Sequence, residues 1–293
     1  MIDPYVSIGI PVYNGAKYIG ETIETILSQS YDNFELIISD NASNDGTSEI
    51  CSSYAEKDKR IRYYRNKVNL GAAFNYNNVF KLSKGKYFKW AAHDDLLSNN
   101  YIEKCIEKME NDPSIIICHP KTTIIDAVGN NIGNYNDLLD FRSKAPNIRL
   151  KNYLFRPAAM WNAIFGLIRS SELKKTPLIG SYPASDQVLL GELILLGKVY
   201  QIQDRLFLRR EHNQRAWLEN PTRREIAIWF DPQNKTKVVL PSKWRIFCEY
   251  LKVIKRIDLA HNIKAKCYII VLKWASEKVL LNTLVRLLRH EKL

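Results

Sequence analysis

The first half of the chain alternates between short apolar runs and segments whose apolar residues recur at helical spacing. Apolar runs at 6–11, 34–39, 61–64 and 86–92 predict buried strands, because a parallel strand covered on both faces keeps no polar side. Between the first two, Ile19, Ile23 and Ile26 recur on one face of a helix. Further helices are predicted around residues 50–54 and over 72–82. This rhythm predicts an α/β fold with a mostly parallel, Rossmann-like sheet flanked by helices.

The second half follows a looser pattern. A strand is predicted at 115–118, a polar connection over 130–149, and an apolar helix over 188–196 that Gly197 ends. Apolar runs at 199–202 and 206–208 predict a closing pair of strands. From residue 243 the chain turns helical, basic and amphipathic. We therefore divide it into a domain at 1–240 and a C-terminal helical region at 241–293.

Composition narrows the class of protein. With 293 residues and 46% hydrophobic content, the chain can bury a full α/β core, which excludes general disorder. Its five cysteines are scattered without a Cys-x-x-Cys pair, so we expect reduced thiols rather than disulfides or a zinc site. The first residues lack the pattern of a signal peptide, and no apolar run approaches the roughly 20 residues that span a bilayer. A cytoplasmic protein is expected.

The net charge of +12 is concentrated at one end. Residues 243–293 hold twelve basic and four acidic side chains, a net charge of +8. Such a tail suits a nucleic acid, an anionic membrane surface or simple solubility.

Two adjacent carboxylates, Asp94 and Asp95, follow the strand predicted at 86–92. In open α/β sheets the carboxyl ends of the strands form the edge where ligands bind. Neighbouring carboxylates repel each other unless a proton or cation intervenes, and a divalent ion that carries substrate phosphates resolves this repulsion. The alternative is that the pair only begins a solvated loop.

Four motifs together resemble glycosyltransferase family 2, in particular the bacterial members that build surface polysaccharides. They are Pro11-Val12-Tyr13-Asn14, the loop 39–47, Asn69-Leu70-Gly71 and His93-Asp94-Asp95. Their order and spacing match over about the first 120 residues, with weaker similarity through His212. The resemblance implies the A-type fold, with a nucleotide-sugar-binding half at 1–120 and an acceptor half at 121–240. It also implies inverting transfer from a nucleoside diphosphate sugar, most often UDP-linked, to a glycan or polyprenyl-linked glycan.

The resemblance assigns the first two motifs to the donor base and ribose. Pro11 and Tyr13 would flank the base, with Asn14 beside them, and Asp40 would accept a hydrogen bond from the uracil imide or the ribose. The alternatives are that Tyr13 is a lid on the core and that Asp40 caps a helix.

The next two motifs would form the pocket wall and the metal site. Asn69 and Gly71 would shape the wall, where Gly71 allows close backbone approach, although Asn-x-Gly alone is most often a turn. Asp95, with Asp94 nearby, would hold Mn²⁺ or Mg²⁺ on the diphosphate. Because His93 stands where many members carry an acidic residue, Asp95 is the preferred ligand of the pair.

Asp186 matches the position of the family's catalytic base. The competing interpretation is a helix N-cap, which Ser185 could also provide. Arg209, Arg210 and His212 follow a predicted strand, where they would meet the diphosphate or the metal; a solvated basic turn is the alternative. As base, Asp186 would take the proton of the acceptor hydroxyl during in-line attack on the anomeric carbon.

Two other functions fit parts of the sequence. The basic tail suits a nucleic-acid-binding protein, but stacking aromatics and recognisable motifs for it are missing, so we expect no nucleic acid partner. A nucleotidyltransferase also uses paired carboxylates, but 11–15 is no Gly-rich phosphate loop. The donor sugar, the acceptor and the oligomeric state stay open.

The tail predicts contact with an anionic membrane surface. Apolar and basic residues share helical spacing over 244–256 and again over 270–289, as in helices that lie in a bilayer surface. The alternative is that these helices pack on the catalytic domain or on another subunit. On the membrane hypothesis, the protein works at the inner face of the cell membrane, and a chain that ends near residue 240 stays soluble.

Overall fold

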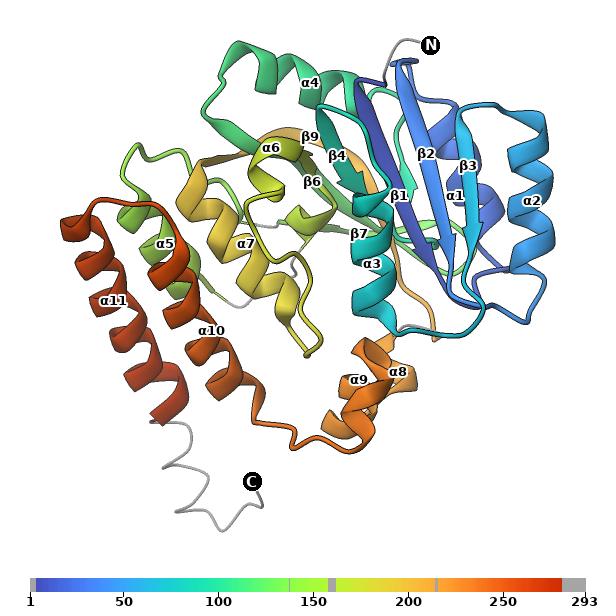
Figure 1. Ribbon diagram of the computed structural model, residues 1–293. Coiled ribbons are helices and arrows are strands. Elements are labelled where there is room, and N and C mark those ends of the chain that lie inside the picture. The colour runs from blue at the N-terminus through green and yellow to red at the C-terminus, as the bar shows by residue number, and fades with distance from the viewer. Residues whose placement is uncertain (1–3, 137, 158–161, 214–215, 281–293) are drawn as a thin grey trace.

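The computed structural model describes residues 4–136, 138–157, 162–213 and 216–280. Within them, nine strands form one sheet in the order β3-β2-β1-β4-β8-β6-β9-β5, with β7 beside β6. Helices cover both faces of this sheet (Figure 1). The α/β fold class is therefore confirmed.

The elements of the first half agree with the predicted ranges to within two residues, except the helix predicted around 50–54, which extends three residues further at each end. The parallel strands are β1 (Val6–Val12), β2 (Phe34–Asp40), β3 (Ile61–Arg65) and β4 (Tyr87–Trp90), and the helices are α1 (Ile19–Leu27), α2 (Thr47–Lys57) and α3 (Ala72–Lys81). Side chains of one strand alternate between two cores: Leu36 and Ile38 face the core of α1, and Ile37 faces that of α3. Burial on both faces explains the apolar runs in the sequence.

Strand β1 does not stop at Pro11, as the sequence suggested, but continues to Val12. Proline removes a backbone donor, which a central strand rarely tolerates. Here the pairing with β4 ends at Gly9, while that with β2 continues to Val12. Pro11 therefore lies where β1 has a partner strand on one side.

Beyond β4 the sheet becomes mixed. Its strands are β5 (Leu96–Leu97), β6 (Ile115–Ile125), β7 (Asn131–Tyr135), β8 (Leu167–Arg169) and β9 (Lys198–Arg210). The predicted closing pair is wrong, because both runs belong to the single strand β9. Pro120 of β6 pairs with Ile202 and Lys121 pairs with Arg205, so the polar residues between bulge without ending the strand.

The polar connection predicted over 130–149 is also wrong in part. It contains β7, which pairs antiparallel with β6, and the start of α5 (Pro146–Phe155). The residues of β7 are exposed or half-buried, so this edge strand lacks the apolar residues by which strands are recognised.

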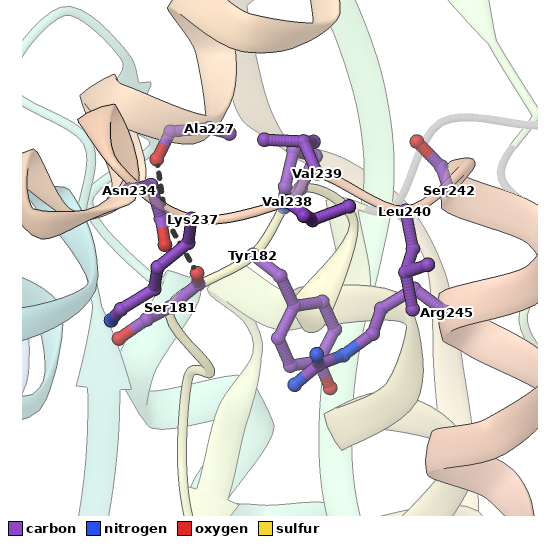
Figure 2. Close-up of a pocket in the computed structure, with 11 residues that line it drawn as sticks. Ser181, Tyr182, Ala227, Asn234, Lys237, Val238, Val239, Leu240, Ser242 and Arg245 are labelled. Atoms are coloured by element: carbon purple, nitrogen blue, oxygen red, sulfur yellow. Dashed lines mark hydrogen bonds between the residues drawn. The ribbon is translucent and has the colours of Figure 1, made fainter.

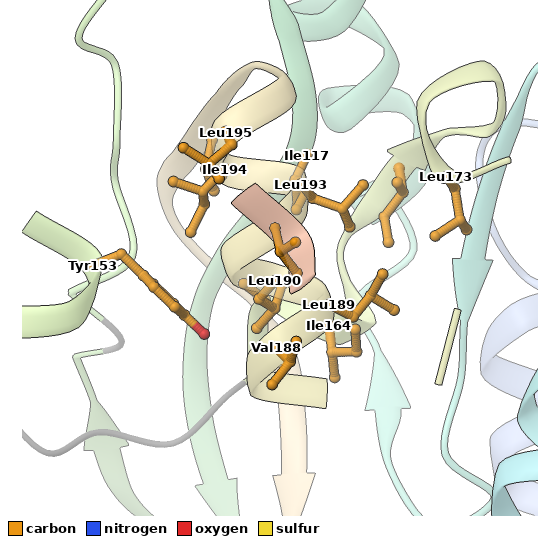
Figure 3. Close-up of a cluster of buried hydrophobic side chains, with 14 of the residues drawn as sticks. Ile117, Tyr153, Ile164, Leu173, Val188, Leu189, Leu190, Leu193, Ile194 and Leu195 are labelled. Atoms are coloured by element: carbon orange, nitrogen blue, oxygen red, sulfur yellow. The ribbon is translucent and has the colours of Figure 1, made fainter. Parts of the chain in front are cut away.

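The remaining helices pack mostly around the second half. They are α4 (Tyr101–Asn111), the 3₁₀ turn η1 (Asn162–Phe165), α6 (Ser170–Leu173), α7 (Ser185–Leu196), α8 (Ala216–Glu219), α9 (Arg223–Phe230), η2 (Pro232–Lys235), α10 (Ser242–Arg256), α11 (His261–Ala275) and the π-helical turn η3 (Ser276–Leu280). From Val188 onward, helix α7 is apolar on every side except at Glu192, as expected of a buried helix, and Figure 3 shows its leucines beside Ile117, Tyr153, Ile164 and Leu173.

The C-terminal helices share the core of the catalytic part. Ile246, Tyr250 and Val253 of α10 and Val271 of α11 belong to the same buried cluster as α7. Figure 1 shows α10 and α11 beside α5 and α7. The predicted boundary at residue 240 falls in the extended link before α10, but this link joins parts of one core. The predicted helical spacing over 281–289 lies outside the described residues.

None of the helices in the described residues combines the length and apolar character needed to cross a membrane.

Candidate active site

Asp94 and Asp95 lie just beyond the carboxyl end of β4, as predicted. Asp95 is buried, and its Oδ1 accepts a hydrogen bond of 2.9 Å from the backbone N–H of Arg210. The Thr22 hydroxyl of α1 donates to the backbone carbonyls of His93 and Asp95, at 2.9 and 3.0 Å. Asp95 therefore fastens β9 to the segment after β4.

Asp94 faces His212, whose Nε2 lies 2.8 Å from its Oδ2. The side chain of Asp94 keeps 16% exposure, and the His212 ring packs against Tyr18 with centroids 4.7 Å apart. A carboxylate and an imidazole are suitable metal ligands, but the His212 side chain is only 3% exposed, so Asp94 is the one that reaches solvent. Of the pair, Asp94 is the one placed to meet a ligand.

The two carboxyl groups titrate in opposite directions. Burial raises the pKa of Asp95 to about 7, and the charge of Asp94 adds to this. Burial also acts to raise the pKa of Asp94, but the positive charge of His93 and the hydrogen bond from His212 outweigh it, so the pKa of Asp94 is lowered. Asp94 is therefore the member of the pair that keeps its negative charge.

Within the described residues, no three or more His, Cys, Asp and Glu side chains gather in a way that could hold a metal ion. Asp94 and His212 provide one oxygen and one nitrogen donor. Mn²⁺ and Mg²⁺ are commonly held by one or two protein groups, with phosphate oxygens and waters as the other ligands. The donors present thus fit an ion that arrives with a diphosphate.

Arg210 is a structural residue in this geometry. Its buried guanidinium pairs with Glu21 of α1 at 2.6 Å and donates to the backbone carbonyl of Asp94 at 2.9 Å and to that of Ala127 at 3.2 Å. Its contacts do not support the predicted role at the diphosphate. Sequence reasoning missed the role shown here because the partners of Arg210 lie 83 to 189 residues away.

Arg209 points to the other side of β9 and is half-buried. Its Nη1 donates to Oδ1 of Asn162 at 3.0 Å, and Asn162 in turn donates to the Thr122 hydroxyl at 3.0 Å. The charge of Arg209 also acts on the carboxyl group of Asp95. Of the predicted basic group, Arg209 therefore acts on Asp95 through its charge, whereas Arg210 and His212 contact Asp94 directly.

The residues predicted to bind the base lie at the ends of β1 and β2. Pro11 is buried, while Tyr13 is 42% exposed. Asn14 has a left-handed φ of 53°, and its Oδ1 accepts from the backbone of Asn44 at 3.0 Å, which joins the loops after the two strands. Tyr13 thus stands at the surface.

Asp40 is completely buried at the end of β2. Its oxygens accept bonds of 2.8 Å from the Ser43 backbone and from the Tyr63 hydroxyl, and α2 has no side-chain cap. Asp40 therefore holds the loop after β2 in place, which differs from both the ligand contact and the helix cap considered from the sequence.

Asn41 organises the pocket wall and was not singled out from the sequence. Its Oδ1 accepts from Leu70 N at 3.0 Å, and its Nδ2 donates to Oδ1 of Asn69 at 2.7 Å and to the Gly71 carbonyl. Gly71 has φ +86°, and a Cβ there would lie 2.6 Å from the Phe230 carbonyl oxygen. The close approach that Gly71 allows is therefore to the end of α9.

Asp186 lies in the first turn of α7, and its carboxylate does not cap the helix. The residue before the helix is Ala184, with φ 64°, and no side chain caps that end. Asp186 is partly exposed, yet the surrounding protein raises its pKa to about 6 by burial. The helix-cap interpretation is not supported.

Tyr76 of α3 is a residue on which the charges of three predicted site carboxylates act. Sequence reasoning did not identify it. Burial raises the pKa of the Tyr76 phenol. The charges of Asp94, Asp95 and Asp186 raise it further. The charges of all three carboxylates therefore reach the Tyr76 phenol.

Comparison with known proteins identifies relatives of the first part of the chain. Residues 7–173 match the family model described as glycosyl transferase family 2. Glycosyltransferase GlyG from Streptococcus pneumoniae is 27% identical over 216 residues, which is 71% of this chain and 71% of that protein. An uncharacterized glycosyltransferase from Rickettsia typhi is 42% identical over 118 residues, 39% of this chain. The first four curated relatives are matched over 36% of their length or less.

Solved structures resemble the fold over nearly the whole chain. Staphylococcus aureus TarS 1–349 in complex with UDP has a TM-score of 0.66 at 17% identity and covers 94% of this chain and 73% of its own. A mannosyltransferase from Pyrobaculum calidifontis in complex with GDP-Man and Mn²⁺ has a TM-score of 0.55 at 16% identity and covers 98% of this chain and 81% of its own. At such identities the likeness shows the fold.

Proposed function

Because this chain belongs to glycosyltransferase family 2, we propose that it transfers a sugar from a UDP-linked donor to a hydroxyl group of a glycan or polyprenyl-linked glycan, with inversion. The fold neighbours include TarS complexes with UDP and with UDP-GlcNAc, which supports a uridine nucleotide as donor. The observation that carries the proposal is the pairing of Asp94 with His212 just beyond the carboxyl end of β4, where Oδ2 and Nε2 lie 2.8 Å apart.

The donor lies along the ends of β1, β2 and β4 in this proposal. Tyr13 offers an exposed ring for the uracil, while Pro11 and Asn14 set the turn beneath it. Asp40, Asn69 and Gly71 act through the hydrogen-bonded loops that form the walls. Arg209 faces the diphosphate in this proposal, because its contact with Asn162 fixes the guanidinium and its charge acts on Asp95.

Asp94 and His212 would hold Mn²⁺ or Mg²⁺, with Asp95 behind them as a second carboxylate. When bound, this ion neutralises diphosphate charge as a Lewis acid. Mn²⁺ in the Pyrobaculum mannosyltransferase complex supports this choice of metal. The protein's own contribution is a carboxylate kept ionised by two histidines and fixed to β9 through the neighbouring Asp95.

Asp186 is the general base. The acceptor oxygen attacks the anomeric carbon, its proton passes to the Asp186 carboxylate, and the bond between that carbon and the diphosphate oxygen breaks with its electron pair. UDP leaves, and the sugar is transferred with inverted configuration. A base whose pKa is about 6 is ionised at neutral pH and still accepts a proton effectively.

The outward face of α10 and α11 favours contact with an anionic membrane surface. Ile269 and Leu272 are 65% and 55% exposed, and Lys266 and Lys273 flank them. Basic groups near anionic lipids contribute about 1 kcal/mol each. We therefore place the enzyme at the inner face of the cell membrane, where surface polysaccharides are built on lipid-linked acceptors.

The direct test is UDP release from a panel of UDP-sugars with Mn²⁺ and a bacterial lipid extract, compared with the Asp186→Asn variant. Release by the wild-type protein, stimulated by the extract and lost in the variant, supports the proposal. Absence of UDP binding and of release with every donor contradicts it.

A further inference from the structure

A cavity of about 110 Å³ lies beside α7, apart from the donor rim. It is enclosed by the loop before α7, one face of α7 and helix α10, with Leu178, Val188 and Leu189 as apolar walls. Its volume is several times the roughly 10–15 Å³ that one water needs. Ser185, at its edge, is the residue immediately before Asp186.

The Ser185 hydroxyl marks this cavity as a polar site. Ser185 is 1% exposed, and its Oγ has no hydrogen-bond partner within the described part of the chain. Folded proteins rarely leave such a group unpaired. Because Ser185 lines the cavity, a ligand bound there can supply the missing partner.

The charged groups around the cavity are already paired with each other. Glu192 forms a bidentate ion pair with Arg256, whose Nε lies 2.7 Å from Oε1 of Glu192. Glu249 pairs with Lys252 at 2.9 Å and with Arg245 at 3.0 Å. Two carboxylates disfavour an anion, and a free cation would have to compete with these bonds. A neutral ligand with several hydroxyl groups suits these walls best.

Tyr182 adds an aromatic wall between this cavity and a second hollow of about 90 Å³. Figure 2 shows the second hollow, with the guanidinium of Arg245 beside the Tyr182 ring, 4.6 Å from its centroid. Val238 and Leu240 of the link before α10 complete that side. The aromatic face of a tyrosine and paired polar groups are suitable contacts for a sugar ring.

We propose that the cavity beside α7 binds a neutral sugar unit of the acceptor, and that Ser185 donates to or accepts from one of its hydroxyl groups. This inference rests on the proposed function, because the proposed base Asp186 is the residue next to Ser185 on α7. The second hollow leaves space for a neighbouring unit of the same glycan. α7 thus carries both the base and a wall of the acceptor site.

The test uses the full chain with UDP and Mn²⁺ and four probes, the methyl glycosides of glucose, galactose, mannose and N-acetylglucosamine. Saturation-transfer NMR measures their binding. We expect at least one to bind, with about fivefold weaker affinity in Ser185→Ala, the usual effect of one lost hydrogen bond. Val188→Phe, which fills the cavity, should abolish binding. Val128→Phe is the matched control, because Val128 is 79% exposed on a distant turn.

The proposal is overturned if no probe binds the wild-type protein, or if a probe binds equally well to Val188→Phe. Should Val188→Phe fail to fold by circular dichroism, Ser185→Ala decides, and unchanged affinity for every probe overturns the proposal. UDP affinity is measured in the same samples. Loss of UDP binding in the wild-type protein contradicts the proposed function, whereas UDP binding without sugar binding contradicts only the acceptor site.

Discussion

Adjacent carboxylates have different tasks in this protein because the chain turns between them. Asp95 is buried and accepts a backbone hydrogen bond from β9, whereas Asp94 keeps partial exposure and meets His212. The family resemblance makes Asp95 the preferred metal ligand, because His93 stands where many members carry an acidic residue. The geometry favours Asp94 instead, since a ligand must reach the diphosphate.

We therefore expect Asp94→Asn to weaken manganese-dependent UDP binding by roughly tenfold or more, since even an outer-shell partner of a metal ligand contributes about that much. Asp95→Asn keeps an oxygen that can accept from Arg210, so its effect on UDP affinity should be smaller. Calorimetry of UDP with and without Mn²⁺ compares the two variants. This prediction is refuted if Asp95→Asn weakens manganese-dependent UDP binding more than Asp94→Asn does.

Asp186→Asn should lower turnover by about 10²-fold or more, because an amide cannot accept the hydroxyl proton, while UDP affinity remains. In the wild-type protein, turnover should fall as pH drops below about 6, where Asp186 becomes protonated. Steady-state rates from pH 5 to 8 measure both effects. A variant with near-normal turnover would remove Asp186 from the mechanism.

Asp186→Asn should also stabilise the fold at neutral pH. Burial raises the pKa of Asp186 above its unfolded value, so the wild-type protein loses stability as pH rises from about 4 to about 6. The Asn variant escapes this loss and should be more stable at pH 8 by ~1–2 kcal/mol, with no gain at pH 4. Urea unfolding at both pH values tests this, with Asp204→Asn on the surface as control. An equal change at both pH values would argue against the shifted pKa.

At the scale of elements, the sequence predicted those whose burial leaves a periodic pattern. The first four strands and their helices, and the positions of Asp94, Asp95 and Asp186, follow from local sequence. Strand β7 is a polar edge strand, so it lacks the apolar alternation that predicts a strand. The polar bulge in β9 looks in sequence like a turn between two strands. The role of Arg210 depends on contacts more than 80 residues away, which no local pattern reports.

The packing of α10 on α7 depends on Gly191. A Cβ at Gly191 would lie 2.6 Å from Cε1 of Tyr250, whose hydroxyl donates to the Gln187 carbonyl at 3.1 Å. Helical Gly→Ala changes usually stabilise, but this one should destabilise by about 1–3 kcal/mol through overpacking. Gly133→Ala is the control, because nothing lies within 4 Å of its Cβ position. Urea unfolding of both variants decides; stabilisation by Gly191→Ala would contradict the tight contact.

At the scale of the whole molecule, the C-terminal helices complete the core that holds the base. The expectation that a chain ending near residue 240 stays soluble is not supported, since removal of α10 and α11 would uncover Tyr153, Leu190 and their neighbours. We expect that truncated chain to aggregate or to lose cooperative unfolding. A chain that ends at Leu280 keeps the described contacts and should unfold cooperatively. Expression and thermal unfolding of both chains test this, and a stable, monomeric 1–240 fragment would contradict the shared core.

Membrane contact is therefore tested by surface substitutions. We expect the wild-type protein to sediment with anionic liposomes at low salt, and the double variant Ile269→Ser with Leu272→Ser to sediment less, because both side chains are exposed on α11. Val128→Ser, also exposed but on a distant turn, is the control. Equal sedimentation of wild-type protein and double variant would exclude this face as the contact.

The pairing of Asp94 with His212 joins residues 118 positions apart, and Asp95 with Arg210 spans 115. Contacts between residues so far apart in sequence form only after the whole intervening chain is available. During synthesis, β1 to β4 leave the ribosome long before β9 does, so the donor half can begin to fold while its carboxylates lack their partners. The proposed metal site of the nascent protein is therefore completed only when residues 210–212 emerge, which makes its completion a late step of biogenesis.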